Sequence, residues 1–198
     1  MSDAPDGPLL DDPDPDDQIT PDDKDWTWVL ERACPTCGFD ASTVAATSVA
    51  GLIRDNVAEW QQRLVASADE LRRRPRPDRW STLEYAAHVR DVFRRFDQRL
   101  MLMLDMDDPL FENWDQDATA LEDRYNDQDP TVVAADLADS GERLAAAFDR
   151  VRSDQWARPG RRSDGAEFTV DSFARYLVHD PIHHLWDVDS ARAVQSGA

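Results

Sequence analysis

Residues 80–104, WSTLEYAAHVRDVFRRFDQRLMLML, contain the most clearly marked helix of this 198-residue chain. Ser81 is a good N-cap, and Glu84, three residues later, completes a capping box, in which each side chain hydrogen-bonds the other residue's backbone N–H. Apolar side chains then recur at steps of three or four residues, which predicts an amphipathic helix that ends near Asp107. These side chains are Tyr85, Val89, Val92, Phe96, Leu100 and Met103.

Three other stretches show helical spacing of apolar residues. We expect one helix from about Thr47 or Ser48 to Arg73, ended by Pro75 and Pro77, and one from Pro130 to about Val151. A last helix is expected from about Thr169 or Asp171 to Ala191.

The links between these helices decide the topology. The stretch from Met106 to Gln128 is too long for a tight antiparallel turn, so we interpret it as a crossover between helices that run parallel. Residues 160–167, rich in Arg, Ser and Gly, are expected to form a surface loop. The sequence therefore predicts an all-α fold, a four-helix bundle with a long crossover between its second and third helices.

Charge and composition divide the chain into three segments. Residues 1–25 hold ten Asp, five Pro and one Lys, a net charge of −9 out of −19, and this composition predicts a disordered acidic arm. Residues 26–46 form an N-terminal segment with a Cys-x-x-Cys turn, and residues 47–193 form the bundle. The simplest account of the acidic surplus is a solvated surface that aids solubility.

The same properties limit the function classes. A strongly acidic chain is a poor ligand for nucleic acid, because phosphate backbones bind Lys/Arg surfaces. No apolar run approaches the roughly 20 residues that span a bilayer, and the N-terminus lacks the pattern of a secretory signal. We expect a cytoplasmic protein with a small-molecule substrate, without nucleic-acid or membrane partners; a homodimer stays open.

The four histidines fall in only two of the predicted helices. His88 lies in the second helix, and His179, His183 and His184 lie in the last. Two donors on one helix reach the same metal when they are three or four residues apart. The last helix offers two such pairs, His179 with His183 and Asp180 with His184.

Periodicity favours the second pair. The face of Asp180 and His184 continues through Phe173, Leu177 and Val188, as a buried stripe would. The face of His179 and His183 continues through Ser172, Arg175, Trp186 and Ser190, which is the pattern of a solvent-exposed side. Metal sites in bundles are built from inward-pointing residues of facing helices, so His88, Asp180 and His184 are the predicted ligands.

Two imidazoles and one carboxylate suit a catalytic divalent metal, because coordination positions stay open for water or substrate. Zinc is the first choice, with nickel, iron and manganese as alternatives. Asp91 lies on the same face as His88 and could hold the second ring nitrogen or another nearby polar group. The competing interpretation is that the histidines are capped or exposed helix residues without a ligand role.

Two motifs carry a resemblance to a known family. Residues 80–91, WSTLEYAAHVRD, together with residues 178–188, VHDPIHHLWDV, resemble the DinB-like superfamily. Its members are four-helix bundles with a long crossover between the second and third helices. The resemblance covers roughly residues 47–188. It implies a metal triad at His88, Asp180 and His184, the same positions that periodicity selects.

The resemblance also suggests a chemistry. Many relatives have histidine at the position of Asp180, whereas mycothiol-dependent maleylpyruvate isomerases, which the chain also resembles, use an acidic residue there. Characterised relatives are often S-transferases or isomerases that use a low-molecular-weight thiol such as mycothiol or bacillithiol. In such a protein the metal would lower the pKa of the thiol and present a thiolate to an electrophile. Arg158, Arg161 and Arg162 could meet an anionic substrate, although a plain solvated loop is the favoured interpretation.

The chain has two cysteines, Cys34 and Cys37, in the sequence CPTCG. Their spacing resembles one half of a zinc knuckle, and no second pair completes it. Three interpretations stay open: a metal site completed by histidines such as His179 and His183 or by a partner chain, a redox dithiol, and a purely structural turn. A turn or zinc site is favoured over redox chemistry, because no strand-and-helix context of the thioredoxin type surrounds the pair.

The leading hypothesis is a metal- and thiol-dependent transferase or isomerase. The first rival is a non-catalytic metal-binding stress-response protein of the same fold, which would close its site with a fourth protein ligand. The second is an interaction module that acts through the acidic arm; it predicts that removing residues 1–25 abolishes function whereas His88→Ala does not.

Overall fold

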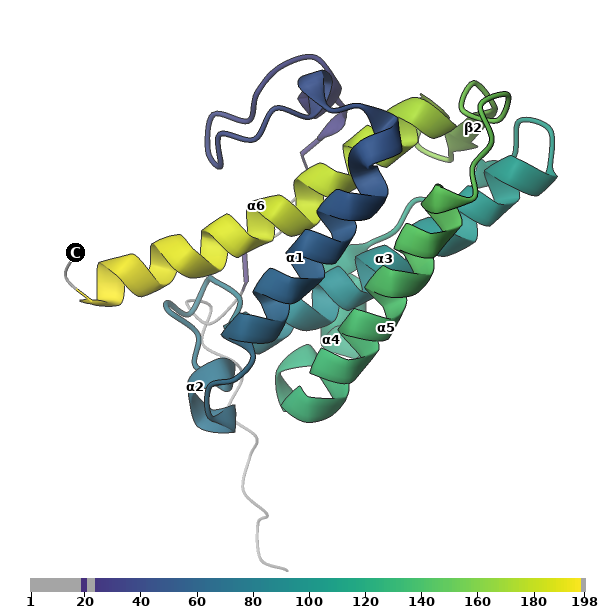
Figure 1. Cartoon of the computed structure of the whole chain (residues 1–198). Helices are drawn as coiled ribbons and strands as arrows, with labels where there is room; N and C mark the ends of the chain where they lie inside the picture. The colour runs from purple at the N-terminus through teal and green to yellow at the C-terminus, as the bar shows by residue number, and fades with distance from the viewer. Residues whose placement is uncertain (1–18, 21–23, 197–198) are drawn as a thin grey trace, which may run out of the picture.

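Four long helices form the body of the protein in a computed structural model, which describes residues 19–20 and 24–196 (Figure 1). They are α1 (Val49–Arg63), α3 (Thr82–Asp105), α5 (Pro130–Asp149) and α6 (Val170–Ser196). Helix α5 packs against α1 and α3 on one side, and α6 contacts the same two helices on the other. The predicted four-helix bundle is confirmed.

The connection between α3 and α5 is the predicted crossover. Oγ of Ser81, at the start of α3, donates a hydrogen bond of 2.7 Å to Oδ1 of Asn126, just before α5. The two helices therefore begin at the same end of the bundle and run parallel. Ser81 and Glu84 also form the predicted capping box at the start of α3.

The predicted first helix is too long. Helix α1 ends at Arg63, and a separate short helix, α2 (Ala68–Arg72), follows. Ser67 caps α2 and forms a second capping box with Glu70, a start signal inside the stretch that apolar spacing had assigned to one helix.

A small sheet lies at one end of the bundle. Strand β1 (Leu110–Phe111) pairs in parallel with β2 (Pro159–Arg162), which pairs antiparallel with β3 (Glu167–Thr169). The expectation of a plain loop over residues 160–167 is therefore wrong. Gly160 lets β2 approach Met103 of α3, where a Cβ atom would clash, and Phe168 of β3 is buried in the core.

The crossover itself is folded rather than extended. After β1 it contains the short helix α4 (Gln116–Glu122) and a 3-10 turn, η5 (Tyr125–Asp127). Tyr125 is fully buried, and Trp114, just before α4, packs against the core. The crossover thus covers one side of α3.

Three 3-10 turns form the segment before α1: η2 (Thr27–Leu30), η3 (Ala41–Thr43) and η4 (Ala46–Ser48). All three contact α6. Of the predicted acidic arm, residues 1–18 and 21–23 lie outside the described residues. The proposed limits of the three segments stay predictions.

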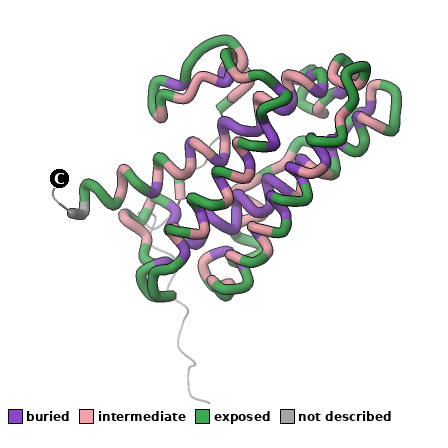
Figure 2. The backbone as a smooth tube through the Cα atoms, in the orientation of Figure 1, coloured by how far each residue is buried: buried purple, intermediate pink, exposed green. Residues whose placement is uncertain are grey.

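The core runs along the centre of the bundle, where buried residues of the long helices face one another (Figure 2). Gly141 allows α5 to approach closely, because a Cβ atom there would collide with Val57 of α1 and press on Phe93 of α3. Within the described part of the chain, no helix has the length and apolar character that crossing a membrane requires.

Candidate metal centre

Neighbouring helices bring the three predicted ligands together. His88 comes from α3, and Asp180 and His184 come from α6. Nε2 of His88 lies 3.3 Å from Oδ1 of Asp180, and Nε2 of His184 lies 3.8 Å from the same oxygen. One donor atom from each residue falls within 4.8 Å of the others, and we call this set the His–Asp–His group. Its role as a metal site stays a prediction.

His88 is fully buried, and neither of its ring nitrogens has a hydrogen-bond partner among the described residues. Its ring stacks on Trp114 at 5.4 Å between centroids, and Trp80 packs against it at 5.2 Å. Oδ1 of Asp180 is likewise buried without a hydrogen bond. Buried polar atoms are normally hydrogen-bonded, and one cation between Nε2 of His88 and Oδ1 of Asp180, which face each other at 3.3 Å, would satisfy both.

Asp91 does not serve His88. Its carboxylate accepts hydrogen bonds from Arg90, Arg94 and the hydroxyl of Tyr125, the last at 2.7 Å. Of the two roles considered for Asp91, the structure therefore shows the second, a contact with other polar groups.

Asp187 orients His184 instead, and sequence analysis missed it. Nδ1 of His184 lies 3.0 Å from Oδ2 of Asp187, three residues further along α6. Because an ionised carboxylate only accepts, Nδ1 of His184 donates to Asp187, and Nε2 is the ring nitrogen on the side of Asp180. The i, i+3 spacing of His184 and Asp187 was the available signal.

The surroundings of Asp180 favour its charged form and fix the position of its backbone. Burial alone would raise the pKa of the carboxyl, but the nearby imidazoles of His88 and His184 outweigh it and hold the pKa well below its usual range. Pro181 follows directly inside α6, and its carbonyl accepts a hydrogen bond of 2.9 Å from the buried Asn56 of α1. This contact secures the segment of α6 that carries the ligands.

Comparison with known proteins places the chain in a family. The sequence model of the DinB superfamily matches residues 52–188. The chain belongs to the DinB superfamily. No curated protein matches it.

The DinB fold is also found in a similar solved structure, described as "YfiT from Bacillus subtilis is a probable metal-dependent hydrolase with an unusual four-helix bundle topology". The TM-score is 0.68 at 18% identity, over 77% of this chain and 87% of the other. At this identity the likeness shows the fold.

A cavity of about 100 Å³ adjoins the His–Asp–His group of this DinB protein and is lined by Asp180 and His184. Arg99 and Arg162 also line it. Burial, together with the charges of Arg162 and Arg95, lowers the pKa of Arg99 to about 10, so the guanidinium stays cationic at neutral pH. The cavity thus has two guanidinium groups beside the candidate metal ligands, and that of Arg162 also pairs with Asp164 at 2.9 Å.

Arg162 is one of three loop arginines that the sequence suggested for an anionic substrate. The other two lie elsewhere: Arg158 donates to the carbonyl of Met103, and Arg161 pairs with Asp108. A larger cavity of about 610 Å³ is lined by Tyr85, Asp187 and neighbours, but by no member of the His–Asp–His group. The smaller cavity is therefore the one in contact with the candidate ligands.

Periodicity had suggested that His179 and His183 lie on a solvent-exposed face, and this prediction is wrong. His179 is only 4% exposed and His183 only 8%, because the segment before α1 covers this side of α6. Burial, reinforced by His183, lowers the pKa of His179 to about 4. The two cysteines lie directly opposite, and we call Cys34, Cys37, His179 and His183 the Cys–His group.

Proposed function

We propose that the protein is a metal-dependent enzyme whose divalent metal is held by His88, Asp180 and His184. The observation that carries this proposal is the convergence of one donor atom from each of the three residues within 4.8 Å, beside a cavity, where neither Nε2 of His88 nor Oδ1 of Asp180 has a hydrogen bond among the described residues. A buried imidazole without any hydrogen bond is costly unless another ligand satisfies it.

The donor set fits such a metal. Two imidazole nitrogens and one carboxylate oxygen suit zinc first, and also nickel, iron and manganese. Among the described residues the group has three members, so open positions would remain for a substrate. This favours an enzyme over a storage or stress-response protein with a closed site. When bound, the metal would supply Lewis acidity and lower the pKa of a coordinated nucleophile.

The surrounding side chains prepare the site. Asp187 fixes the ring of His184, and the indoles of Trp80 and Trp114 keep water from His88. Arg99 and Arg162 would bind an anionic group of a small-molecule substrate in the cavity. A volume of about 100 Å³ is well below that of a pocket for a drug-sized ligand, so it accommodates only the reacting end of a larger molecule.

For the reaction we propose transfer or isomerisation with a low-molecular-weight thiol, such as mycothiol, as the nucleophile. The support is Asp180, because the mycothiol-dependent isomerases that the chain resembles also have an acidic residue at this position. Hydrolysis, with water in place of the thiol, is the second candidate, and the description of YfiT as a probable metal-dependent hydrolase favours it.

Metal analysis tests the metal site. The purified full chain is compared with His184→Ala and Asp180→Asn, and Asp189→Asn serves as a control because it is an exposed carboxylate on the same helix. The two site variants should lose about one metal ion per chain, while the control keeps it. Circular dichroism checks that each variant is folded. Equal metal content in all four proteins would refute the proposal.

Activity assays then separate the reactions. The metal-loaded protein is incubated with a simple anionic electrophile with and without mycothiol, and in parallel with ester and amide substrates. Conjugation or isomerisation that needs both the thiol and His184 supports the first reaction. Thiol-independent cleavage that needs His184 would replace it with hydrolysis.

A further inference from the structure

We propose that Cys34, Cys37, His179 and His183 form a second metal site, a structural zinc site that fastens the N-terminal segment to α6. The proposal does not depend on the function proposed for the His–Asp–His group. Sγ of Cys34 lies 3.6 Å from Nδ1 of His183, and Sγ of Cys37 lies 3.8 Å from Nε2 of His179. All four donor atoms fall within 4.8 Å of one another.

These separations are those of ligands around one zinc ion. With zinc–sulfur bonds of about 2.3 Å and zinc–nitrogen bonds of about 2.0–2.1 Å, a tetrahedral site places sulfur and nitrogen about 3.6 Å apart. The two distances in the structure, 3.6 and 3.8 Å, agree with this value. Hydrogen bonding between a thiol and an imidazole would explain each contact alone, but not the convergence of both pairs on one point.

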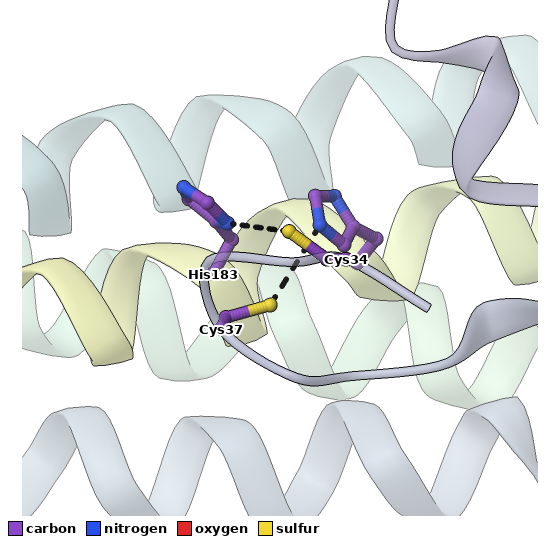
Figure 3. A group of neighbouring side chains, drawn as sticks. Cys34, Cys37 and His183 are labelled. Atoms are coloured by element: carbon purple, nitrogen blue, oxygen red, sulfur yellow. Dashed lines mark hydrogen bonds between the residues drawn. The ribbon is translucent and has the colours of Figure 1, made fainter. Parts of the chain in front are cut away.

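Local structure presents each pair of donors. The cysteine turn is closed by hydrogen bonds from Gly38 N–H to the carbonyl of Cys34 and from Cys34 N–H to that of Phe39. Gly38, with a φ of +76°, supplies the left-handed conformation that lets the chain reverse after Cys37. On α6, His179 and His183 are four residues apart and share one face. Figure 3 shows the sulfur of Cys34 directed towards the ring of His183 on the helix.

The site has four protein ligands and little access to solvent. Cys34 is 1% exposed, His179 and His183 are nearly as buried, and Cys37 is half-buried. A set of two thiolates and two imidazoles completes a tetrahedral shell, which is the arrangement of structural rather than catalytic zinc. A redox dithiol would require neither histidine.

The Cys–His group lies where the segment before α1 meets α6, next to the cavity beside Asp180. The segment before α1 packs on α6 through the rings of Trp26, His179 and His183, with Trp26 5.2 and 5.3 Å from the two imidazoles. Trp26 also lines the cavity beside Asp180. Zinc at the Cys–His group would therefore fix one wall of that cavity, and the binding free energy of the metal would hold a short segment that has little core of its own.

The test uses the full-length protein as purified under reducing conditions. Zinc per chain and the rate at which iodoacetamide alkylates the thiols are measured before and after chelation. We expect both thiols to be protected with zinc bound, and alkylation to become about tenfold faster or more once a chelator removes it. Equal alkylation rates before and after chelation would overturn the proposal.

A second measurement detects the thiolate ligands directly in the wild-type protein and then in variants. The chain is produced with Co²⁺ in place of Zn²⁺, because thiolate ligands give cobalt an intense near-ultraviolet charge-transfer absorption that nitrogen and oxygen ligands do not. This absorption should be present in the wild type and in His184→Ala, and it should be clearly weaker in Cys37→Ser, which removes one of the two thiolates. Thr36→Ser, in the same turn, is the matched control and should keep it.

The two metal proposals fail separately in this experiment. If His184→Ala loses one metal ion per chain and keeps the thiolate absorption, the result supports the Cys–His site. This conclusion holds whether or not the protein is an enzyme. Cobalt bound by the wild type without thiolate absorption would overturn the Cys–His site and leave the His–Asp–His group in place.

Discussion

Asp187 lies between the two candidate metal sites and offers the sharpest test of both. Its carboxylate oxygen Oδ2 is 3.0 Å from Nδ1 of His184 and 3.7 Å from Nε2 of His183. The first separation is a hydrogen bond, and the second is longer than one. One side chain is therefore expected to affect the two sites to different degrees.

We predict that Asp187→Ala weakens metal binding at the His–Asp–His group by about 10- to 100-fold, the usual cost of removing a carboxylate that orients a ligating histidine. This corresponds to about 1.4–2.8 kcal/mol. At the Cys–His group the affinity should fall by less than about tenfold, because the contact with His183 is not a hydrogen bond.

The assay is competition between the protein and a zinc chelator, measured in two backgrounds. Cys37→Ser leaves the His–Asp–His group as the zinc site, and His184→Ala leaves the Cys–His group. Asp189→Ala is the control, because Asp189 lies two residues further along α6 and pairs with Arg63 of α1. A change below about twofold in the Cys37→Ser background, or a larger loss in the His184→Ala background, would refute the reasoning.

Three other predictions follow from contacts in the bundle. Burial alone would raise the pKa of Asp91, but hydrogen bonds and charges from Arg90 and Tyr125 outweigh it and lower the pKa. Asp91 therefore stabilises the fold above the ordinary carboxyl pKa, and this contribution is lost as the pH falls through the lowered value. Asp91→Asn should lower the free energy of unfolding by about 2–4 kcal/mol at pH 7 and remove that part of the acid sensitivity below about pH 4. Urea unfolding at a series of pH values measures both effects, and parallel pH profiles of the two proteins would contradict this. Gly141→Leu should lower the free energy of unfolding by about 1–3 kcal/mol or more, because the helices must separate, and an unchanged melting temperature would disprove the close approach. Arg162→Met should raise KM for an anionic substrate at least about tenfold and leave KM for a neutral analogue unchanged; equal effects on both would exclude charge recognition.

The sequence was sufficient for the helical framework because the signals for α3, α5 and α6 are local. The capping box of Ser81 and Glu84, the proline at position 130 and the apolar spacing all act within a few residues. The same kind of signal, at Ser67 and Glu70, also marked the break between α1 and α2, but the continuing apolar spacing concealed it.

The His–Asp–His group could be selected from sequence because its members on α6 are spaced by four residues and share the face that continues into the core. The partner of each imidazole was harder to predict. Asp91 and Asp187 both stand three residues after a ligand, yet only Asp187 reaches one, because Arg90 and Tyr125 hold Asp91 elsewhere.

What the sequence determined by itself is therefore the four long helices, the crossover between α3 and α5, and the residues of the His–Asp–His group. Tertiary structure alone decided that residues 110–111, 159–162 and 167–169 form a sheet and that the segment before α1 covers His179 and His183. Both depend on contacts between residues far apart in the chain. Periodicity shows which face of a helix is apolar. It cannot show that a polar face is buried by a distant segment of the chain. Here the segment before α1, which is short and only partly apolar and carries the two cysteines, covers the polar face of α6.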